Sequence, residues 1–459
     1  MSQRSLEDVL RSTNPVDLLR QSQTGPYAFP VVRPEFTNWR DEQRAWRESC
    51  ALLDQSHHMT DLYLEGPDAL RLLSDLGVNS VATFKVNQAK QFLACNPDGY
   101  VIGDAILFYL AQNRFSLVGR PPAHNWVQYH VERGGYDVRA ERDERSAMNQ
   151  GRRKVFRFEL QGPRAPQVMA KILGAVPPDI RFFHMDRFTI AGRAVAALRH
   201  GMVGQPGWEL FGAWEDGDAV RDAIVEAGRE FGLRLVGSRA YPTSCLESGW
   251  IPSPLPAVYT GSDMRAYREW LTDRSYEATA SVGGSFAAHD IREYYLTPYD
   301  LGYGHMVKFD HEFVGRPALE RMAVAPQRKK VTLVWNEEDV ARTYRSVFAV
   351  PGSAPKYIDL PLANYSTLPF DQVLAGDTHI GLSTYTGFSA NERAMLSLAV
   401  IDVAHATPGT EVEVLWGEPG GGTSKPTVER HVQTRLRAIV APAPISRTAR
   451  ESYRPKAQD

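Results

Sequence analysis

Two stretches of sequence decide the fold: Asp61-Leu-Tyr-Leu-Glu-Gly-Pro-Asp68 and Phe156-Arg-Phe-Glu-Leu-Gln-Gly-Pro163. In both, apolar residues alternate as in a β-strand, and a Gly then interrupts the pattern. The Pro that follows can occupy the first position of a helix, and an amphipathic segment comes next. The repeated Leu-x-Gly-Pro therefore predicts two similar modules, each with a strand followed by a helix.

The sequence around these stretches predicts two hairpins and a β-rich final region. Residues 100–110 are strongly apolar, Ala-Gln-Asn makes a turn, and residues 114–119 return. Residues 194–199 and 208–211 form the second hairpin, joined by the loop Gly-Met-Val-Gly-Gln-Pro-Gly. Beyond Gln327, short apolar runs separated by Pro and Gly indicate a mostly β third domain.

The composition is typical of a globular protein with several domains. A chain of 459 residues exceeds one ordinary core, and 43% hydrophobic residues leave ample material to bury. The 52 Lys and Arg residues nearly balance the 54 Asp and Glu residues, so the charge gives no reason to expect a nucleic-acid partner.

Signals for a membrane, a disulfide framework or a metal site are missing from the sequence. No stretch approaches the ~18 apolar residues of a membrane span, and the first residues lack the apolar core of a secretory signal. Cys50, Cys95 and Cys245 are widely spaced and fit neither a disulfide framework nor a zinc pattern. His57 and His58 are adjacent, so their side chains diverge. We expect a cytoplasmic protein that binds no metal.

Four segments place polar residues in apolar surroundings. Asp54-Gln-Ser-His-His58 follows an apolar run, Asp104 interrupts an apolar strand, and Glu209 lies between two large apolar residues. The fourth segment is Arg-Ala-Tyr-Pro-Thr-Ser-Cys-Leu-Glu-Ser-Gly-Trp at 239–250. Each alone is compatible with an ordinary loop end, but together they favour a shared pocket.

At these residues the chain resembles the aminomethyltransferase family of the glycine cleavage T-protein, from about Gly25 to Ala441. The family-wide matches are Leu-x-Gly-Pro twice, the strand with Asp104, Gly-Gln-Pro-Gly-Trp-Glu at 204–209, and Phe-Val-Gly-Arg-Pro-Ala-Leu-Glu at 313–320. Within the family, the chain is most similar to tetrahydrofolate-dependent aryl O-demethylases that act on vanillate and syringate. These matches are Asp-Gln-Ser-His-His-Met, Gly-Ser-Arg-Ala-Tyr-Pro, Leu-Glu-Ser-Gly-Trp-Ile-Pro-Ser-Pro-Leu-Pro and Gly-Tyr-Gly-His-Met-Val-Lys-Phe-Asp-His.

The resemblance implies an α+β fold of three domains in a cloverleaf around a central folate channel. Two domains would contain ferredoxin-like αβ modules, which fits the repeated Leu-x-Gly-Pro, and the third would be a C-terminal β-barrel. We expect the first domain, which binds folate, to comprise residues 1–66 and 152–318. The second αβ domain would comprise residues 67–151, and the barrel domain residues 319–459.

The resemblance also implies which residues bind the cofactor, tetrahydrofolate. Asp104 and Glu209 would hold the pterin, because a carboxylate accepts paired N–H donors, and Trp250 would pack against the folate. The expected partners are folate and a small aromatic substrate, with no nucleic acid and no membrane. Monomer and homodimer both stay open.

One departure from the family indicates the reaction. In the glycine-cleavage branch, the stretch at 240–247 reads approximately Ala-Arg-Asp-Ser-Leu-Arg-Leu-Glu, whereas here Ala-Tyr-Pro-Thr-Ser-Cys-Leu-Glu has lost both arginines. Tyr241 brings a phenol with a free pKa near ~10, which can donate a proton to an ether oxygen. We therefore expect a methyltransferase that moves the methyl group of a methoxylated benzoate to N5 of tetrahydrofolate. The products would be 5-methyl-tetrahydrofolate and a free phenol.

We expect the other pocket residues to hold the aromatic substrate. His58 would orient Tyr241 or relay its proton, Gln55 would hydrogen-bond the ring oxygens, and Arg120 would pair with the benzoate carboxylate. Phe29 stands where vanillate-type sequences have a tyrosine, which makes the wall slightly roomier. This favours syringate, with vanillate and 3-O-methylgallate as further candidates.

Alternative interpretations are open for each residue and for the function. His58 would cap the following strand, Arg120 would serve as an ordinary ion-pair partner, and Tyr241 would be a core tyrosine bonded to a backbone carbonyl. The alternative functions are another methyl or aminomethyl transferase of the T-protein type and a non-catalytic folate-binding regulatory protein.

Overall fold

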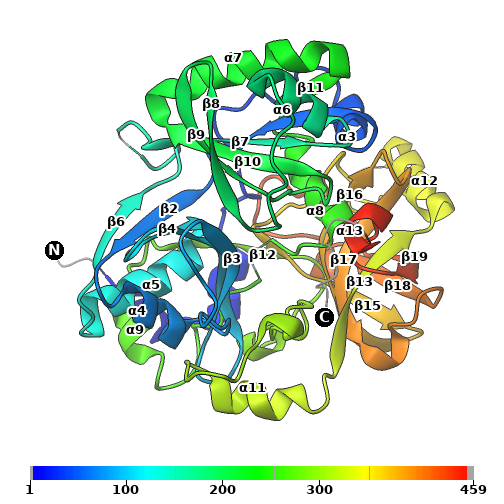
Figure 1. Cartoon of the computed structure of the whole chain (residues 1–459). Helices are drawn as coiled ribbons and strands as arrows, with labels where there is room; N and C mark the ends of the chain where they lie inside the picture. Colours follow the sequence, from blue (N-terminus) through cyan, green and yellow to red (C-terminus); the bar gives the residue numbers. More distant parts are fainter. Residues whose placement is uncertain (1–3, 150, 253, 351, 452–459) are drawn as a thin grey trace.

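The computed structural model describes residues 4–149, 151–252, 254–350 and 352–451. Its main strands form two open sheets and a closed barrel, and Figure 1 shows these as three lobes grouped around the middle of the molecule. The expected α+β class and the C-terminal β-barrel are confirmed.

The first sheet has six strands in the order β11-β1-β7-β10-β9-β8. Their bounds are β1 (Cys50–Asp54), β7 (Val155–Gln161), β8 (Met185–Ile190), β9 (Arg193–Leu198), β10 (Gly207–Ala213) and β11 (Leu233–Val236). β1 pairs with β11 in parallel and with β7 in antiparallel fashion. The hairpin predicted around residues 194–211 is confirmed as β9 and β10.

The second sheet has five strands in the order β3-β4-β5-β2-β6. Their bounds are β2 (Thr60–Glu65), β3 (Gln88–Cys95), β4 (Val101–Ala111), β5 (Arg114–Gly119) and β6 (Arg139–Asp143). β4 and β5 form the other predicted hairpin. Strand pairing thus groups β2 with residues 88–143, whereas the predicted domain division at residue 66 places β2 in the first domain. The division itself stays a prediction.

Six strands close the barrel in the order β13-β17-β16-β15-β18-β19. Their bounds are β13 (Arg328–Trp335), β15 (Asp371–Ala375), β16 (Thr378–Ser389), β17 (Ala394–Asp402), β18 (Glu411–Trp416) and β19 (Thr434–Ala441). A short parallel pair, β12 (Val282–Gly283) and β14 (Leu368–Pro369), lies outside it. Trp335 and Trp416 pack inside the barrel with Val331, Leu333 and Val414.

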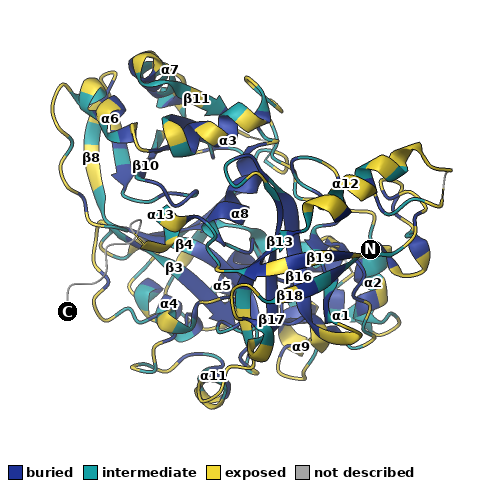
Figure 2. Cartoon of the chain, turned by 90° about the vertical axis from the view of Figure 1, so that its right-hand side faces the viewer, coloured by how far each residue is buried: buried dark blue, intermediate teal, exposed yellow. Residues whose placement is uncertain are grey.

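Helices cover the outer faces of the sheets, and Figure 2 shows their exposed sides turned to solvent. α6 and α7 pack on the first sheet, whereas α4 and α5 pack on the second. The helices are α1 (Leu6–Leu10), α2 (Pro15–Gln21), α3 (Trp39–Glu48), α4 (Ala69–Leu76), α5 (Pro121–Arg133), α6 (Ala165–Leu173), α7 (Gly217–Gly228), α8 (Ser244–Ser248), α9 (Arg265–Trp270), α10 (Tyr276–Thr279), α11 (Arg316–Ala323), α12 (Glu337–Arg345) and α13 (Arg447–Glu451).

Both copies of Leu-x-Gly-Pro make the expected passage from strand to helix. Gly66 ends β2 with a φ of +151°, and Gly162 ends β7 with a φ of +126°. A Cβ atom at these positions would lie 2.2 Å from the Asp137 carbonyl oxygen and 2.6 Å from that of Ser49. Only glycine fits such contacts. The prediction for the prolines is wrong by two positions, because each precedes the residue that caps α4 or α6 and so lies outside the helix.

Apolar and polar residues alternate along β7, and both faces of this strand are buried. Phe156, Phe158 and Leu160 pack under α6 and α7, as the sequence predicts. The intervening residues Arg157, Glu159 and Gln161 are also buried, at 4%, 0% and 0% exposure. A period-2 pattern normally has its polar side in water, and here that side faces the interior of the molecule instead.

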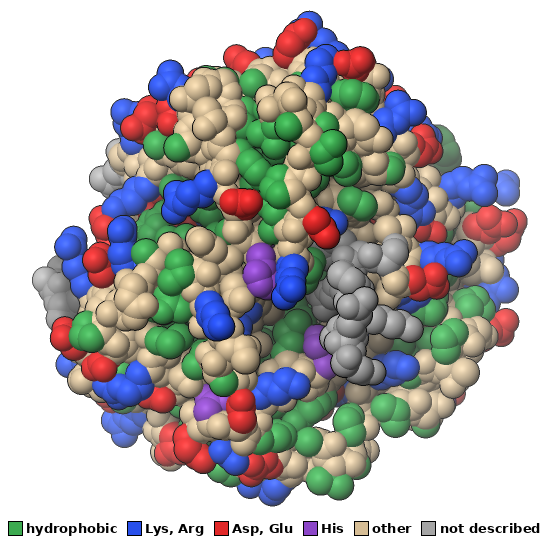
Figure 3. All heavy atoms as spheres, viewed as in Figure 1, with side chains coloured by type: hydrophobic (Ala, Val, Ile, Leu, Met, Phe, Trp, Pro, Cys, Tyr) green, Lys and Arg blue, Asp and Glu red, His purple; other side chains and the backbone are tan. Residues whose placement is uncertain are grey.

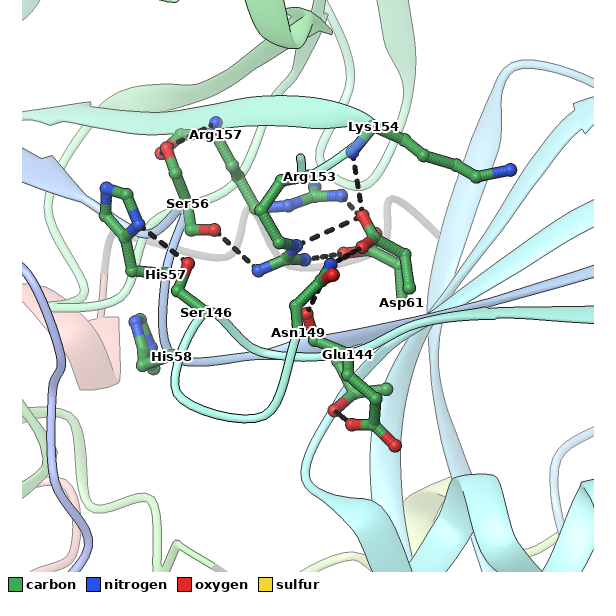
Figure 4. Close-up of polar contacts among 12 residues, drawn as sticks. Ser56, His57, His58, Asp61, Glu144, Ser146, Asn149, Arg153, Lys154 and Arg157 are labelled. Atoms are coloured by element: carbon green, nitrogen blue, oxygen red, sulfur yellow. Dashed lines mark hydrogen bonds and ion pairs between the residues drawn. The ribbon is translucent and has the colours of Figure 1, made fainter. Parts of the chain in front are cut away.

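A buried ionic network joins the first two sheets. The Arg157 guanidinium on β7 lies 2.9 Å from the Asp61 carboxylate on β2 and also pairs with Glu209 on β10. Arg153 bridges Asp61 and Asp143, at 2.9 and 3.1 Å. Figure 4 shows both guanidinium groups beside the turn that carries Ser56, His57 and His58. This network fixes the connection between β1 and β2, which carries the predicted site residues.

Candidate active site

A cavity of about 600 Å³ opens between the three lobes. Figure 3 shows histidine and Lys or Arg side chains gathered near the middle of this face. The second sheet contributes Asp104, Ile106 and Val118, the loop after β9 contributes His200 to Met202, and the barrel contributes Lys329, Lys330 and Tyr385. Of the residues predicted from sequence, the cavity is lined by Phe29, His58, Asp104, Arg120, Tyr241 and Trp250. Segments far apart in the chain thus share one pocket.

Three rings form one wall of the cavity. The ring centre of Phe29 lies 4.7 Å from that of His58 and 4.9 Å from that of Tyr241. His58 comes from the turn between β1 and β2, and Tyr241 begins the 3-10 helix Tyr241–Thr243 after β11. His57 points elsewhere, because its Nδ1 lies 2.9 Å from the Ser146 hydroxyl (Figure 4). Of the adjacent histidines, only His58 lines the cavity.

The Tyr241 hydroxyl is buried without a normal hydrogen bond. No partner lies within bonding geometry among the described residues, and Gln55 is the side chain that approaches it. Burial raises the pKa of Tyr241 well above its usual value, and the nearby Glu159 adds to this effect. The phenol therefore keeps its proton. The alternative in which this hydroxyl bonds a backbone carbonyl is wrong for the described part of the chain.

His58 is a neutral imidazole in this environment. Burial lowers its pKa to about 3, and the positive charge of Arg120 acts in the same direction. A neutral imidazole can both donate and accept a hydrogen bond, whereas an imidazolium can only donate. His58 therefore has the protonation state that a proton relay requires.

Arg120 lines the cavity at the point where β5 ends and α5 begins. Its guanidinium lies over the ring of Tyr27, 4.1 Å from the ring centre. Among the described residues it forms no ion pair, so the ordinary ion-pair interpretation is wrong there. The Tyr27 hydroxyl in turn donates to the His58 carbonyl oxygen. Nothing in the sequence marks Tyr27 as a site residue, because a single tyrosine between Pro and Ala belongs to no recognisable motif.

Asp104 and Trp250 meet directly at another wall. The Asp104 carboxylate accepts hydrogen bonds from Gln91 at 2.6 Å, from the Trp250 indole at 3.1 Å and from the Tyr303 hydroxyl at 3.1 Å. All of these end on Oδ2, and Oδ1 receives none from the part of the chain that the structure describes. Burial raises the pKa of Asp104. One carboxylate oxygen is therefore available to an N–H donor in the cavity.

Gln55 and Glu209 are buried and do not line the cavity. Neither amide atom of Gln55 has a hydrogen-bond partner among the described residues. Glu209 pairs with Arg157 on the polar side of the first sheet. Directly across from it in the strand register is Glu159, which the sequence interpretation missed.

Two further features are absent from the described residues. Within the described ranges, no group of three or more His, Cys, Asp or Glu side chains is arranged to hold a metal ion. No helix within the described ranges has the length and apolar character needed to cross a membrane.

Comparisons with known proteins agree on one family. The family model of the GCVT N-terminal domain matches residues 20–253. Syringate O-demethylase from Sphingobium sp. (strain NBRC 103272 / SYK-6) is 51% identical over 98% of both chains. Sesamin methylene transferase from Sinomonas sp. (strain No.22) is 36% identical, over 86% of this chain and 88% of the relative.

The solved structures extend this likeness to the fold. Glycine cleavage system aminomethyltransferase T from Bartonella henselae superposes with a TM-score of 0.61, over 95% of this chain and 98% of that one. At 19% sequence identity this match concerns the fold alone. Together with the sequence matches, it shows that the chain belongs to the aminomethyltransferase family defined by the GCVT N-terminal domain.

Proposed function

We propose that this protein is a tetrahydrofolate-dependent O-demethylase that takes the methyl group from a methoxylated benzoate, with syringate favoured. The likeness to syringate O-demethylase over almost the whole chain supports this assignment. The observation that carries it is the cavity wall itself, where a phenol and a guanidinium lie together, the phenol without a hydrogen bond and the guanidinium without a carboxylate partner among the residues that the structure describes. These two groups match the two polar ends of a methoxylated benzoate.

Arg120 would bind the benzoate carboxylate. Its planar guanidinium can make two parallel hydrogen bonds to a carboxylate. The Tyr27 ring under the guanidinium limits its orientations, which lowers the entropy lost on binding. The substrate ring would then extend along the wall of Phe29, His58 and Tyr241.

Tyr241 would donate a proton to the ether oxygen as the methyl group leaves. Without such a donor the leaving group is a phenoxide, and general acid catalysis typically contributes ~10²–10⁴ in rate. The buried phenol is fully protonated before the reaction, so the proton is available at the moment when charge develops. His58, neutral and in ring contact with Tyr241, would hold the phenol in place or accept a hydrogen bond from it.

The cavity also fits the cofactor that the family uses. Asp104 has one oxygen free for a pterin N–H, and Trp250 is held by the same carboxylate. Lys329 and Arg450 line the cavity and suit the carboxylates of the glutamate tail of folate. Tetrahydrofolate, when bound, supplies N5 as the methyl acceptor. Glu209 would support cofactor binding from behind the cavity wall, through its ion pair with Arg157. Gln55 would form hydrogen bonds beside the Tyr241 hydroxyl.

The experiment is an incubation of the full chain with tetrahydrofolate and syringate, vanillate or 3-O-methylgallate. We expect 5-methyl-tetrahydrofolate and the corresponding free phenol in equal amounts, with the fastest conversion from syringate. The Tyr241→Phe protein serves as the matched control, since it should bind folate without comparable turnover. Tight folate binding with no methylated folate from any of these substrates would identify a non-catalytic folate-binding protein instead.

A further inference from the structure

Glu159 is the buried acidic residue in the first sheet that the proposed reaction leaves without a role. It is fully buried, at 0% exposure, in the middle of β7. Neither of its carboxyl oxygens has a hydrogen-bond partner among the described residues, although the backbone N–H of Met202 approaches the group. A buried carboxylate in such a position would be very costly, so the group must hold a proton.

The strand register places Glu159 between two parts of the site. Its partner on β10 is Glu209, and its partner on β1 is Leu53. Directly opposed residues on neighbouring strands point to the same face of the sheet, with Cβ atoms ≈ 4.5–5.5 Å apart. Leu53 packs in one apolar cluster with Tyr241. Glu159 therefore lies behind the cavity wall, near enough to the Tyr241 phenol to interact with it electrostatically.

The two glutamates are not equivalent. Burial raises the pKa of Glu209, and the Arg157 guanidinium that pairs with it opposes this rise by stabilising the charged form. Glu159 has no such partner in the described part of the chain, and burial together with the charge of Glu209 raises its pKa well above the usual value. When two carboxyl groups share one site, the proton stays on the one without the cation. The charged groups that face Glu159 are Glu209 and Arg157, with Arg199 directly after β9.

We propose that Glu159 is a proton donor that acts through Tyr241 and restores its hydroxyl after each methyl transfer. This rests on the proposed function. In the first step the O–H bond of Tyr241 and the bond between the methyl carbon and the ether oxygen break, and the O–H bond of the product phenol forms as the methyl group passes to the acceptor. In the second step the O–H bond of Glu159 breaks and that of Tyr241 forms again. The methyl acceptor releases one proton when its N–H is replaced by N–CH3, so the overall reaction is proton-neutral and Glu159 returns to its acid form.

Because Tyr241 is buried, its hydroxyl needs a second proton donor, Glu159, after it has given up its own proton. Tyr241 is only 4% exposed, and a tyrosinate in this position has no cation in contact among the described residues. Gln55 lies beside the same hydroxyl, and neither of its amide atoms bonds any residue that the structure describes, so it can orient the phenol toward the acid. Three buried side chains, Gln55, Glu159 and Tyr241, thus supply the unpaired donors and acceptors of one short proton path.

Rapid-quench kinetics of Glu159→Gln test the proposal. Glutamine keeps the shape of the side chain but cannot give up a proton at neutral pH. With tetrahydrofolate and syringate saturating, we expect the first turnover at near the wild-type rate, because Tyr241 still carries its proton. Later turnovers should be slower by ~10²-fold. Glu159→Asp keeps an acid and should recover part of the steady-state rate. Equal slowing of the first and later turnovers, or no slowing, would overturn the proposal.

Infrared spectroscopy gives a readout that needs no turnover. The difference between the spectra of the wild-type and Glu159→Gln proteins, with no substrate present, should contain the carbonyl stretch of one protonated carboxylic acid. A difference spectrum that contains a carboxylate band instead would sink the proposal. Glu277→Gln is the control, because Glu277 is equally buried but accepts hydrogen bonds from Asn125 at 3.0 and 3.1 Å. Glu277→Gln should leave the rates of both the first turnover and the later turnovers unchanged. A wild-type protein that makes no methylated folate would refute the proposed function, and the infrared result would still decide the state of Glu159.

Discussion

The imidazole ring of His58 stands edge-on to the phenol ring of Tyr241, with ring centres 4.9 Å apart and ring planes inclined by 69°. Phe29 touches both rings from a third side. The phenol is therefore held by packing, while its hydroxyl makes no normal hydrogen bond to the described residues. Packing fixes the orientation of the phenol ring, and the hydroxyl is available to bond the substrate.

Tyr241→Phe should fold and bind folate but lose ~10²–10⁴ in kcat, because only the proton donor is removed. The ring keeps its contacts with Phe29 and His58, so the melting temperature should change little. Combining Tyr241→Phe with His58→Ala should add little to the loss if the two residues act as a unit. Fully additive losses in the double variant would assign them separate roles.

Arg120→Ala should raise the KM for benzoates by ~10–100-fold, which corresponds to the loss of a charged hydrogen bond. Uncharged methoxyphenols have no carboxylate and should be affected much less. Arg120→Lys keeps the charge but not the paired geometry, so it should recover only part of the affinity. The same loss for both substrate types would show that Arg120 does not recognise the carboxylate.

Phe29→Tyr should shift preference away from syringate and toward vanillate. The added hydroxyl occupies space and brings a polar group to a wall now made of three rings. A change of this size in an apolar pocket is worth about 1–3 kcal/mol. The measurement is kcat/KM for syringate, vanillate and 3-O-methylgallate in both proteins. A native preference for vanillate would contradict the role of Phe29 while leaving methyl transfer intact.

His58 should make the protein less stable in acid. Its folded-state pKa of about 3 lies below the ordinary value of 6.5, so in this window the unfolded chain binds the proton more readily. Stability from this group is complete above 6.5 and is lost as the pH falls toward 3. His58→Gln should therefore flatten the decline of the urea midpoint between neutral and acidic pH. His289→Gln, at an exposed histidine, is the control. An unchanged slope in His58→Gln would mean that His58 does not titrate in this way.

Asp61→Asn should destabilise the protein by about 3–5 kcal/mol, because it leaves Arg153 and Arg157 buried with one fewer counter-charge. Glu65→Gln on the same strand breaks only an exposed pair with Arg114, whose side chains are 64% and 62% exposed. That change should cost at most ~1 kcal/mol. Similar urea midpoints for the two variants would exclude a stabilising role for the buried network.

The repeated Leu-x-Gly-Pro predicted its structure because the requirement is local. Gly66 and Gly162 must adopt a positive φ against neighbouring backbone, and the residues on either side carry ordinary strand and helix patterns. The hairpins were predictable for the same reason. The positions of Pro67 and Pro163 were not, since the first helical residue depends on how the turn packs.

The buried polar side of β7 could not be read from the sequence. Arg157, Glu159 and Gln161 alternate with apolar residues just as the solvent side of a surface strand does. Their burial results from loops contributed by residues 55–58, 201–205 and 240–245, which are distant in the chain. A carboxyl group in such a place was recognisable only once the strands were paired.

The order of strands along the chain has a consequence for biosynthesis. β1 leaves the ribosome early, but its neighbour β7 begins only at residue 155 and its other neighbour β11 only at residue 233. All strands of the second sheet lie in the interval between β1 and β7, so this sheet is complete in the nascent chain first. Domains generally fold as units during synthesis, and unpaired strand edges attract other chains. One edge of the strand that leads into His58 therefore stays open until β7 is translated, and the other edge stays open until β11, the last strand of its own sheet, is translated.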